Sequence, residues 1–476
     1  MVSHPDVSKF DISTIGASTG TSVSKDNLRN THVAAGSALL YVAVLGMLTS
    51  YSAPATADMK EPGSRFRDLT PDQTTWIGSL PNLGCLIGNI TFGYVTHAFG
   101  RKAAMMLLSL FYLLSWLSVA YAPTLIWIYI GRLVGGICGG ASCVAIPTYL
   151  VEIAPTKIRG QLTSGFQIAN TIGAFLIMSL GIILRWSWLA ISGASVVACA
   201  SCIMLFMPES PPWLLRSSRS TEAIRGLKFL KGKQCNIEKE LIDILGSIQY
   251  KEERIALRDF LDSKFFKPAF ISLALMFFQQ ACGIGPLLAY TVEIFQTSRS
   301  SIDPSIAAAM VALVEVIGSI ANGSLIDRSG RKFLYITSYS FMSISLLFLG
   351  FYNFVLVRDP ISVRSYGYVP LICIVVYKFS YSLGSGSIPY IMIPELVPIK
   401  HRSVVMAMGG VMCSLVAFVS NKSFEVLRVL LGDYGVYWTY GSISFISVVF
   451  GFCILPETKG LTILQINESF SNVVSK

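Results

Sequence analysis

The chain has 476 residues, of which 53% are apolar and 13% are charged, and its formal net charge is +10. Soluble globular proteins contain about 25% charged residues, so this composition excludes a large soluble domain. The apolar runs are about 20 residues long, which is the length that a helix needs to cross a hydrocarbon core of about 30 Å. In such a protein a positive net charge reflects basic cytoplasmic loops, so we expect a lipid bilayer and no nucleic acid as the partner.

In chain order, residues 1–31 are polar and predict a disordered tail without a cleavable signal peptide. Twelve apolar segments follow, and each is a predicted transmembrane helix: 32–53, 74–97, 103–121, 125–150, 161–184, 187–207, 268–291, 304–326, 333–356, 369–393, 403–428 and 435–455. The glycine-rich run GRLVGGICGGASCVAIP in the fourth segment predicts a tight helix–helix seam.

One long polar insert, 208–267, separates the sixth and seventh segments, and the helical spacing of apolar residues over 241–261 predicts short amphipathic helices. The predicted organisation is an all-α membrane protein with two six-helix bundles. Its parts are a cytoplasmic tail (1–31), a first bundle (32–207), an intracellular helical linker (208–267), a second bundle (268–455) and a cytoplasmic tail (456–476). Most Lys and Arg residues then lie on the cytoplasmic side, which agrees with the positive-inside rule. We expect a multi-pass plasma-membrane protein with both termini in the cytoplasm.

Three motifs occur twice in the same order. Residues 93–102 read GYVTHAFGRK and residues 323–332 read GSLIDRSGRK, and each copy lies between two apolar segments. EIAPTKIRG, with Glu152 and Arg159, is repeated as ELVPIKHRS, with Glu395 and Arg402. PES and PET close the sixth and twelfth segments. The repetition indicates two related halves, and duplicated helical halves are typical of transporters.

At this point the chain resembles the sugar-porter branch of the major facilitator superfamily. The matching strings run in the family's order from about residue 32 to 460: PTYLVEIAPTKIRG, PESPPWL, FFQQACG, GSLIDRSGRK, SIPYIMIPEL and PETKG. LTPDQTTWIGSLPNLG resembles the arthropod facilitated trehalose transporter-like subgroup. The resemblance implies two six-helix bundles in the major facilitator fold, alternating access and a sugar site between the bundles. It also implies a carrier without a cofactor that functions as a monomer.

The repeated charges at the cytoplasmic helix ends resemble the family's intracellular gate. Partly exposed ion pairs are each worth about 0–1 kcal/mol, so only a network would hold such a gate. The predicted gate residues are Arg101, Glu152, Arg159, Asp327, Arg328, Arg331, Glu395 and Arg402. His97 and Ala98 replace the Asp327–Arg328 pair in the first copy, so we expect the second half to carry more of the inner latch.

Uncharged polar residues inside apolar helices are the candidates for binding sugar, because an amide offers both a donor and an acceptor. Gln167 stands eight residues after Arg159, as the family's sugar-contacting Gln does, although a helix–helix hydrogen bond is the alternative. Gln279 and Gln280 match the family's paired Gln. Adjacent side chains point about 100° apart on a helix, so we expect one of them to face the sugar and the other a neighbouring helix. Gly285–Pro286 predicts a bend beyond them.

Segment ten supplies further candidates. Lys378, Ser382, Gly386 and Tyr390 recur every four residues, which predicts a shared face. Tyr390 stands where hexose carriers usually keep a Trp, and Asn421 in segment eleven matches another sugar contact of the family.

Four charges fall inside predicted helices: Arg132, Glu315, Lys378 and Lys422. A buried unpaired charge is costly, so each should find a partner or water. For Glu315 two alternatives stay open, an ion pair with Lys378 or a substrate or proton site. Lys422 is expected to extend toward the outer interface.

The expected function is a facilitative carrier for trehalose or a hexose. Proton-coupled members of the family carry an Asp in the first helix near the Arg of segment four, whereas 33–53 has no acidic residue facing Arg132. This favours uniport over proton symport, which stays the alternative together with a transporter-like sensor and a carrier of another organic solute. We expect no enzyme activity, because no nucleophile–base arrangement is recognisable, and no metal or cofactor.

Overall fold

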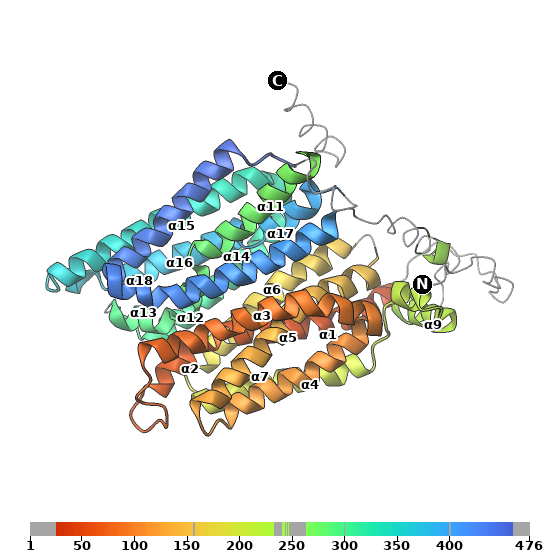
Figure 1. The fold of residues 1–476 in the computed structure, drawn as a ribbon, viewed down its shortest axis with the longest axis horizontal. Coiled ribbons are helices and arrows are strands. Elements are labelled where there is room, and N and C mark those ends of the chain that lie inside the picture. The colour runs from red at the N-terminus through yellow and green to blue at the C-terminus, as the bar shows by residue number, and fades with distance from the viewer. Residues whose placement is uncertain are drawn as a thin grey trace.

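The computed structural model describes residues 25–155, 158–232, 240–242, 244, 246, 263–298, 300–398 and 401–459, which form long helices that lie side by side (Figure 1). Most of the predicted amphipathic stretch 241–261 and most of the predicted tails lie outside these residues. The side chains of Arg159 and Asp327 also lie outside the described set, so their gate roles stay predictions.

The first half of the chain forms one bundle and the start of the insert. Its helices are α1 (Lys25–Ser50), α2 (Ser52–Met59), α3 (Pro71–Phe99), α4 (Arg101–Ala120), α5 (Leu125–Ile153), α6 (Arg159–Leu180), α7 (Trp186–Leu205), α8 (Pro211–Arg216) and α9 (Ser220–Lys231). The predicted segment 32–53 is therefore divided, because α1 ends at Ser50 and α2 continues from Ser52 to Met59. α1 also begins inside the predicted tail, where Thr31 donates a hydrogen bond of 2.9 Å to the Leu230 carbonyl near the end of α9.

The second half forms the other bundle. Its helices are α11 (Ser263–Ala281), α12 (Ile284–Ala289), α13 (Thr291–Thr297), α14 (Pro304–Ser329), α15 (Arg331–Arg358), η4 (Arg364–Tyr366), α16 (Val369–Ser380), the π-helix η5 (Tyr381–Ser385), α17 (Ile388–Leu396) and α18 (Arg402–Cys453). α18 changes direction at Gly432, whose φ of 74° separates the two predicted segments 403–428 and 435–455.

The predicted bend at Gly285–Pro286 lies elsewhere. α11 ends at Ala281, and Gly283 turns the chain with a φ of 90° before α12 begins. A Cβ atom on Gly283 would lie 2.5 Å from the ring of Tyr440, so glycine is needed there for space as well as for conformation. The break is therefore made by a left-handed glycine against an aromatic ring, and the proline only follows it.

Nine helical stretches within the described residues are long and apolar enough to cross a membrane. α3 and α6 are also long but are not among them, and α18 counts as one stretch although it divides at Gly432. These additions account for the twelve predicted crossings. α3 packs against α18 and α6 against α14, so the two less apolar helices are those that face the opposite bundle.

Two large clusters of buried apolar side chains form the cores. One lies mainly within α1–α7 and the other within α11–α18. In Figure 1 the red-to-yellow helices of the first bundle lie together, and the green-to-blue helices of the second lie beside them. The architecture therefore consists of two helical layers that meet along the α3–α18 and α6–α14 seams.

The predicted glycine seam joins α3 to α5. A Cβ atom on Gly136 would lie 2.2 Å from the carbonyl oxygen of Pro81, and one on Gly140 would lie 2.2 Å from that of Cys85. The helices approach so closely only because these positions lack side chains, which confirms the seam predicted from GRLVGGICGGASCVAIP.

We expect Gly136→Ala to destabilise the first bundle by about 1–3 kcal/mol, because α3 and α5 must move apart. Gly93→Ala is the matched control, since nothing lies within 4 Å of its added Cβ atom. Thermal unfolding in detergent should show a lower Tm for Gly136→Ala and no loss for Gly93→Ala. An equal Tm for both variants would contradict the close seam.

Candidate functional site

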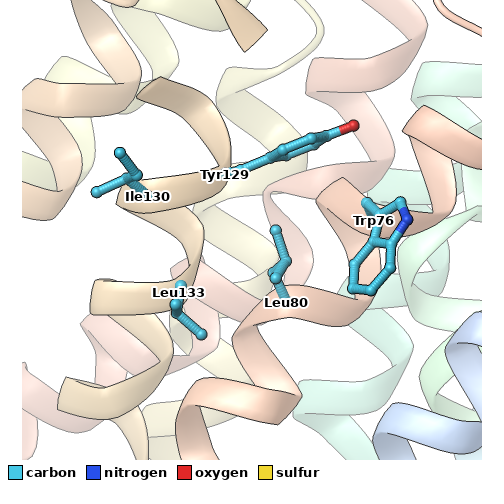
Figure 2. Close-up of a pocket in the computed structure, with 5 residues that line it drawn as sticks. All are labelled: Trp76, Leu80, Tyr129, Ile130 and Leu133. Atoms are coloured by element: carbon cyan, nitrogen blue, oxygen red, sulfur yellow. The ribbon is translucent and has the colours of Figure 1, made fainter. Parts of the chain in front are cut away.

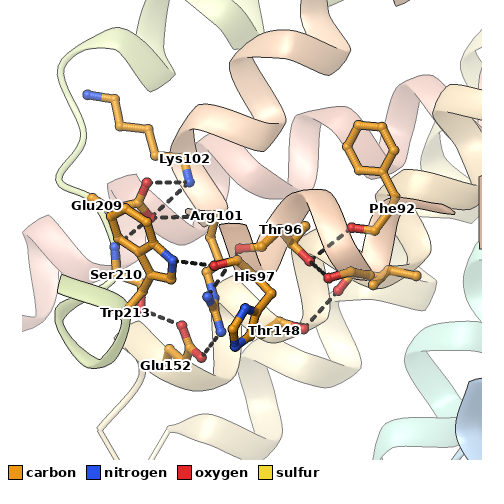
Figure 3. Close-up of polar contacts among 12 residues, drawn as sticks. Phe92, Thr96, His97, Arg101, Lys102, Thr148, Glu152, Glu209, Ser210 and Trp213 are labelled. Atoms are coloured by element: carbon orange, nitrogen blue, oxygen red, sulfur yellow. Dashed lines mark hydrogen bonds and ion pairs between the residues drawn. The ribbon is translucent and has the colours of Figure 1, made fainter. Parts of the chain in front are cut away.

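The Gly-Arg-Lys and Pro-Glu-Ser motifs of the first half form one polar cluster (Figure 3). The Glu209 carboxylate accepts hydrogen bonds from the main-chain N–H groups of Arg101 and Lys102 at 2.9 Å, which are the first of α4. These N–H groups have no partner inside the helix, and the positive helix end favours an anion. Gly100 makes room for the carboxylate: its φ is 99°, and a Cβ atom there would lie 2.5 Å from Glu209 Oε2.

The same cluster contains the predicted acidic gate residue. Arg101 Nη2 lies 2.8 Å from Glu152 Oε1, and the hydroxyl of Ser210 donates to the other Glu152 oxygen. Trp213 Nε1 donates to the main-chain carbonyl of His97 at 2.8 Å. The cluster therefore ties α3, α4, α5 and the chain that leaves α7 to one another.

The second half has an equivalent set of hydrogen bonds and an equivalent ion pair. Glu457 accepts from the main-chain N–H groups of Arg331 (3.0 Å) and Lys332 (3.1 Å) at the start of α15, after Gly330 with a φ of 88°. Arg331 Nη2 lies 3.2 Å from Glu395 Oε1, and the Thr458 hydroxyl donates to the other oxygen of Glu395. The three duplicated motifs are thus one structural unit in each half.

The end of the molecule with the Gly100 and Gly330 turns is called the glycine-turn end below. Among the described residues, the Arg101–Glu152 and Arg331–Glu395 pairs there each join partners of one half. Nε and Nη2 of Arg402 are buried without a hydrogen-bond partner in the described part of the chain, and burial lowers the pKa of this guanidinium. Arg328 is exposed. Its main-chain carbonyl accepts from Lys459.

The paired glutamines differ in exposure, and the buried one is Gln279. Its side chain is 1% exposed, and Nε2 donates to the main-chain carbonyl of Gly386 at 2.7 Å. Gln280 is half-buried, with its Nε2 3.2 Å from Cys413 Sγ. Tyr390, 44% exposed, places its hydroxyl 3.7 Å from the same sulfur. We call Gln280, Tyr390 and Cys413 the Gln280 cluster.

Cys413 was not singled out from the sequence, because a Cys in an apolar helix usually serves as a small packing residue. Its spacing from Tyr390 along the chain carries no recognisable signal, since the two residues belong to different helices, α17 and α18. Only the packing of α18 against α11 and α17 brings its thiol to Gln280 and Tyr390.

The predicted shared face of segment ten is wrong beyond Ser382. The π-helix η5 follows Lys378 and changes the turn, so Lys378 (1% exposed) and Ser382 (2%) are buried while Tyr390 is 44% exposed. Ser382 uses its hydroxyl within its own helix, by donating to the Lys378 carbonyl at 3.1 Å. Its one donor is therefore used inside the helix in this conformation.

The main chain of this π-helix and of the residues on either side of it is bonded by side chains from three neighbouring helices. Gln279 of α11 donates to Gly386, Asn322 of α14 donates to the Leu383 carbonyl, and Ser338 of α15 donates to the Ser380 carbonyl at 2.6 Å. A π-helix leaves main-chain groups without their usual partners, and an apolar surrounding offers no water to replace them. These contacts therefore hold the irregular turn in place.

Glu315 and Lys378 form a buried ion pair between α14 and α16. Lys378 Nζ lies 3.5 Å from Glu315 Oε2, and the two residues are 1% and 7% exposed. This agrees with the ion-pair alternative for Glu315. Neither atom has a hydrogen-bond partner in the described part of the chain, so the pair is held by charge attraction alone.

Arg132 lies inside the first bundle and is 1% exposed. Its Nη1 donates to the Leu48 carbonyl (2.6 Å), its Nε to the Ile77 carbonyl (3.1 Å), and its Nη2 to the Ser52 hydroxyl (2.6 Å). The guanidinium therefore occupies the break between α1 and α2, where main-chain carbonyls lose their helical partners. All three of its nitrogen groups are bonded to neutral oxygens.

The opposite end of the molecule, called the loop end, carries polar contacts between the bundles that sequence reasoning missed. Lys60 Nζ lies 3.2 Å from Glu293 Oε2, and Arg428 Nη1 lies 2.9 Å from Glu293 Oε1. Burial acts to raise the pKa of Glu293, but Lys60 and Arg428 outweigh it and hold that pKa below its ordinary value. The partners are 233 and 135 residues apart, so no local pattern reveals them.

Lys422 and Asn421 also lie at the seam between the bundles. Lys422 Nζ is 2.5 Å from Asp72 Oδ1, so it is paired and does not simply extend to the interface as predicted. Asn421 is 3% exposed and donates to the Gly78 carbonyl at 3.5 Å. Its predicted role as a sugar contact remains untested, and in this conformation its amide faces α3.

Two apolar pockets border these polar groups. One of about 330 Å³ is lined by Trp76, Leu80, Tyr129, Ile130 and Leu133 of α3 and α5 (Figure 2). Another of about 440 Å³ lies among α14, α15 and the α16–η5 segment. Neither is lined by a residue predicted to bind substrate. Gln167 of α6 is half-buried and stays a prediction from sequence.

Comparisons with known proteins agree on the family and the fold. Residues 28–470 match the family described as "Sugar (and other) transporter". The facilitated trehalose transporter Tret1 of Apis mellifera ligustica is 32% identical over 437 residues, which cover 91% of this chain and 86% of the bee protein. Trehalose transporter 1 of Drosophila melanogaster is also 32% identical, and the chain spans about half of its length (51%).

Two solved structures show a similar fold. The inward-open conformation of the xylose transporter XylE from E. coli has a TM-score of 0.78 at 20% identity, and the likeness covers 92% of this chain and 99% of XylE. The proton:xylose symporter XylE bound to 6-bromo-6-deoxy-D-glucose has a TM-score of 0.75 at 21% identity, over 93% and 100% of the two chains. These likenesses confirm the predicted major facilitator fold.

We expect Glu315→Gln to cost about 3–5 kcal/mol of stability, because it leaves the Lys378 ammonium buried without its counter-charge. The double variant Glu315→Leu, Lys378→Met removes both charges and should recover most of this loss. Thermal unfolding of wild type, single and double variants in detergent measures the difference. A double variant that is as unstable as the single one would refute the charge pairing.

The ionised Glu457 should stabilise the second half in a pH-dependent way. Burial acts to raise its pKa, but hydrogen bonds from the N–H groups of Lys459, Arg331, Lys332 and Thr458 outweigh it and lower that pKa. The stabilisation is therefore complete above the ordinary value of 4.5 and is lost as the pH falls through the lowered one.

In a stability profile from about pH 6 to pH 3.5, the difference between wild type and Glu457→Gln should shrink on the acid side. The exposed Glu61→Gln serves as the control for loss of a carboxylate. A difference that does not change with pH would show that the ionised Glu457 contributes nothing.

Proposed function

The chain belongs to the sugar transporter family, and we propose that it is a facilitative carrier that moves trehalose or a hexose across the plasma membrane by alternating access. The name of the bee relative, a facilitated trehalose transporter, favours trehalose as the first solute to test. We propose that residues 32–207 and 268–455 are the moving bundles and that 208–267 links them. The glycine-turn end, both tails and the linker would face the cytoplasm, and a monomer would suffice.

The observation that carries the proposed sugar site is that the adjacent amides of Gln279 and Gln280 donate to different partners. The amide N–H of Gln279 donates to the main-chain carbonyl of Gly386 at the end of the π-helix, whereas the half-buried amide of Gln280 lies beside Tyr390 and Cys413. An amide next to an exposed aromatic ring suits a sugar, which presents hydroxyl groups and an apolar C–H face. We propose that Gln280, Tyr390, Cys413 and Gln167 contact the sugar. In the same proposal Gln279, Ser382 and Asn421 position the surrounding helices.

Uniport is supported by the environment of Arg132. A proton-coupled carrier needs a carboxylate that gains and loses a proton as the bundles move, and Arg132 is bonded instead to neutral oxygens that cannot titrate. Glu315 is the carboxylate inside the bundles that a symport mechanism would use, and it is already paired with Lys378. We therefore propose that the substrate gradient alone drives transport.

We expect wild-type protein in proteoliposomes to equilibrate labelled trehalose or glucose without concentrating it, at a rate that an imposed proton gradient does not raise. Gln280→Ala should lower uptake at least tenfold through a higher KM, because a lost hydrogen bond to substrate leaves a sugar hydroxyl unpaired. Gln167→Ala should act in the same direction.

Gly36→Ala is the control for expression and insertion in this assay, because nothing lies within 4 Å of its added Cβ atom. Uptake that is unchanged in both glutamine variants would refute the proposed site. Accumulation against a gradient when a proton gradient is imposed would favour the symport alternative, and competition by anionic solutes alone would favour a different cargo.

A further inference from the structure

We infer that the loop end carries an ionic latch that joins the two bundles and determines how readily the carrier opens to the outside. The latch consists of Lys60 with Glu293 and of Asp72 with Lys422. Each pair has one partner in the first bundle and one in the second. The inference rests on the proposed function in assigning the loop end to the outside of the cell and in taking the two bundles to move against each other.

In the Lys60–Glu293 pair, the Glu293 carboxylate is oriented by other residues of the second bundle. Arg428 holds one oxygen of Glu293 at 2.9 Å and is itself fixed by Asp433 at 2.7 Å and Glu425 at 3.5 Å. The other oxygen faces the first bundle, where Lys60 meets it at 3.2 Å. Because Arg428 orients the carboxylate before Lys60 arrives, little side-chain ordering remains to be lost when the bundles close.

The Lys422 half of the latch places one ammonium among three groups of α3. Lys422 Nζ lies 2.5 Å from Asp72 Oδ1 and 3.2 Å from the Thr75 hydroxyl, and it lies 4.3 Å from the centre of the Trp76 ring. The carboxylate and the ring both attract a cation, and the capping of α3 by Thr70 holds the first turn that carries Asp72. A single side chain of α18 is therefore recognised by a complete turn of α3.

Close packing beneath the ion pairs shows that the bundles touch at this end. A Cβ atom on Gly78 of α3 would lie 3.1 Å from the Tyr290 hydroxyl, and the Tyr290 ring stacks on Phe424 at 4.9 Å between centroids. The Asn421 amide reaches the Gly78 carbonyl across the same seam. The loop end is thus closed by a layer of close contacts with the ion pairs above it.

Among the residues that the structure describes, the two ends of the molecule differ in how their ion pairs are placed. At the glycine-turn end, Arg101–Glu152 and Arg331–Glu395 stay within one bundle, whereas at the loop end Lys60–Glu293 and Asp72–Lys422 cross from one bundle to the other. When the bundles separate at the loop end, both crossing ion pairs must break. The ion pairs within each bundle stay intact during this motion. The latch therefore favours the conformation that is closed to the outside.

The test uses the full-length protein in proteoliposomes of known orientation. Modification of Cys413 from the loop side by an uncharged, membrane-impermeant maleimide is quantified by mass spectrometry of the peptide that contains it. Lys422→Glu and Glu293→Gln should each speed this modification by about two- to fivefold, the size expected for partly exposed ion pairs. Asp72→Lys combined with Lys422→Glu restores opposite charges and should return the rate toward that of wild type.

Arg358→Glu is the matched control, because this substitution changes the charge by the same amount as Lys422→Glu. Arg358 lies 4.3 Å from the centre of the Phe354 ring, which belongs to its own bundle. Spin labels at Glu61 and Ile361, both exposed at the loop end of opposite bundles, provide a second readout in a cysteine-free background. Their distance distribution should gain a longer component in Lys422→Glu.

Unchanged modification rates and distances in Lys422→Glu and Glu293→Gln would overturn the latch, as would an equal acceleration in Arg358→Glu. These readouts need no substrate, so the latch and the proposed function fail separately. Faster modification without uptake of any sugar would keep the latch and remove the sugar-carrier proposal. Normal sugar uptake with unchanged accessibility would do the reverse.

Discussion

A main-chain group that leaves its helix inside an apolar bundle must find another partner, and the rest of this structure depends on how that requirement is met. Water is scarce there, and an unpaired N–H or C=O group costs several kcal/mol. The helix is interrupted between α1 and α2 and again within the α16–α17 segment. At each interruption a side chain from a neighbouring helix donates a hydrogen bond to the main chain. Arg132 bonds the Leu48 carbonyl at the first break, and Gln279 bonds the Gly386 carbonyl at the second.

This requirement separates residues that bind from residues that support. Gln279 and Gln280 are adjacent and chemically identical, yet the amide donor of Gln279 bonds the main chain whereas that of Gln280 points to Cys413, beside Tyr390. The helix starts after Gly100 and Gly330 follow the same rule, with Glu209 and Glu457 as the capping carboxylates. The duplicated motifs are repeated because each half has to satisfy the same helix end.

The two ends of the molecule use charge differently. At the glycine-turn end, carboxylates cap helices and bind arginines of their own bundle, so this network is compatible with motion of one bundle against the other. At the loop end, Lys60 and Lys422 bind carboxylates of the opposite bundle. Because a moving carrier must break contacts between bundles and keep those within them, the location of an ion pair matters more for function than its strength.

The sequence by itself determined the twelve helices, the duplication and the family, because apolar length and local motifs are set by residues close in the chain. It also indicated the Glu315–Lys378 pair, since a buried charge in a membrane helix needs a partner. Only the tertiary structure decided that η5 is a π-helix, that Tyr390 turns away from Lys378, and that Cys413 lies beside Gln280. It also decided that Lys60 pairs with Glu293. These features join residues far apart in the chain, and their geometry depends on how whole helices pack, which no local spacing encodes.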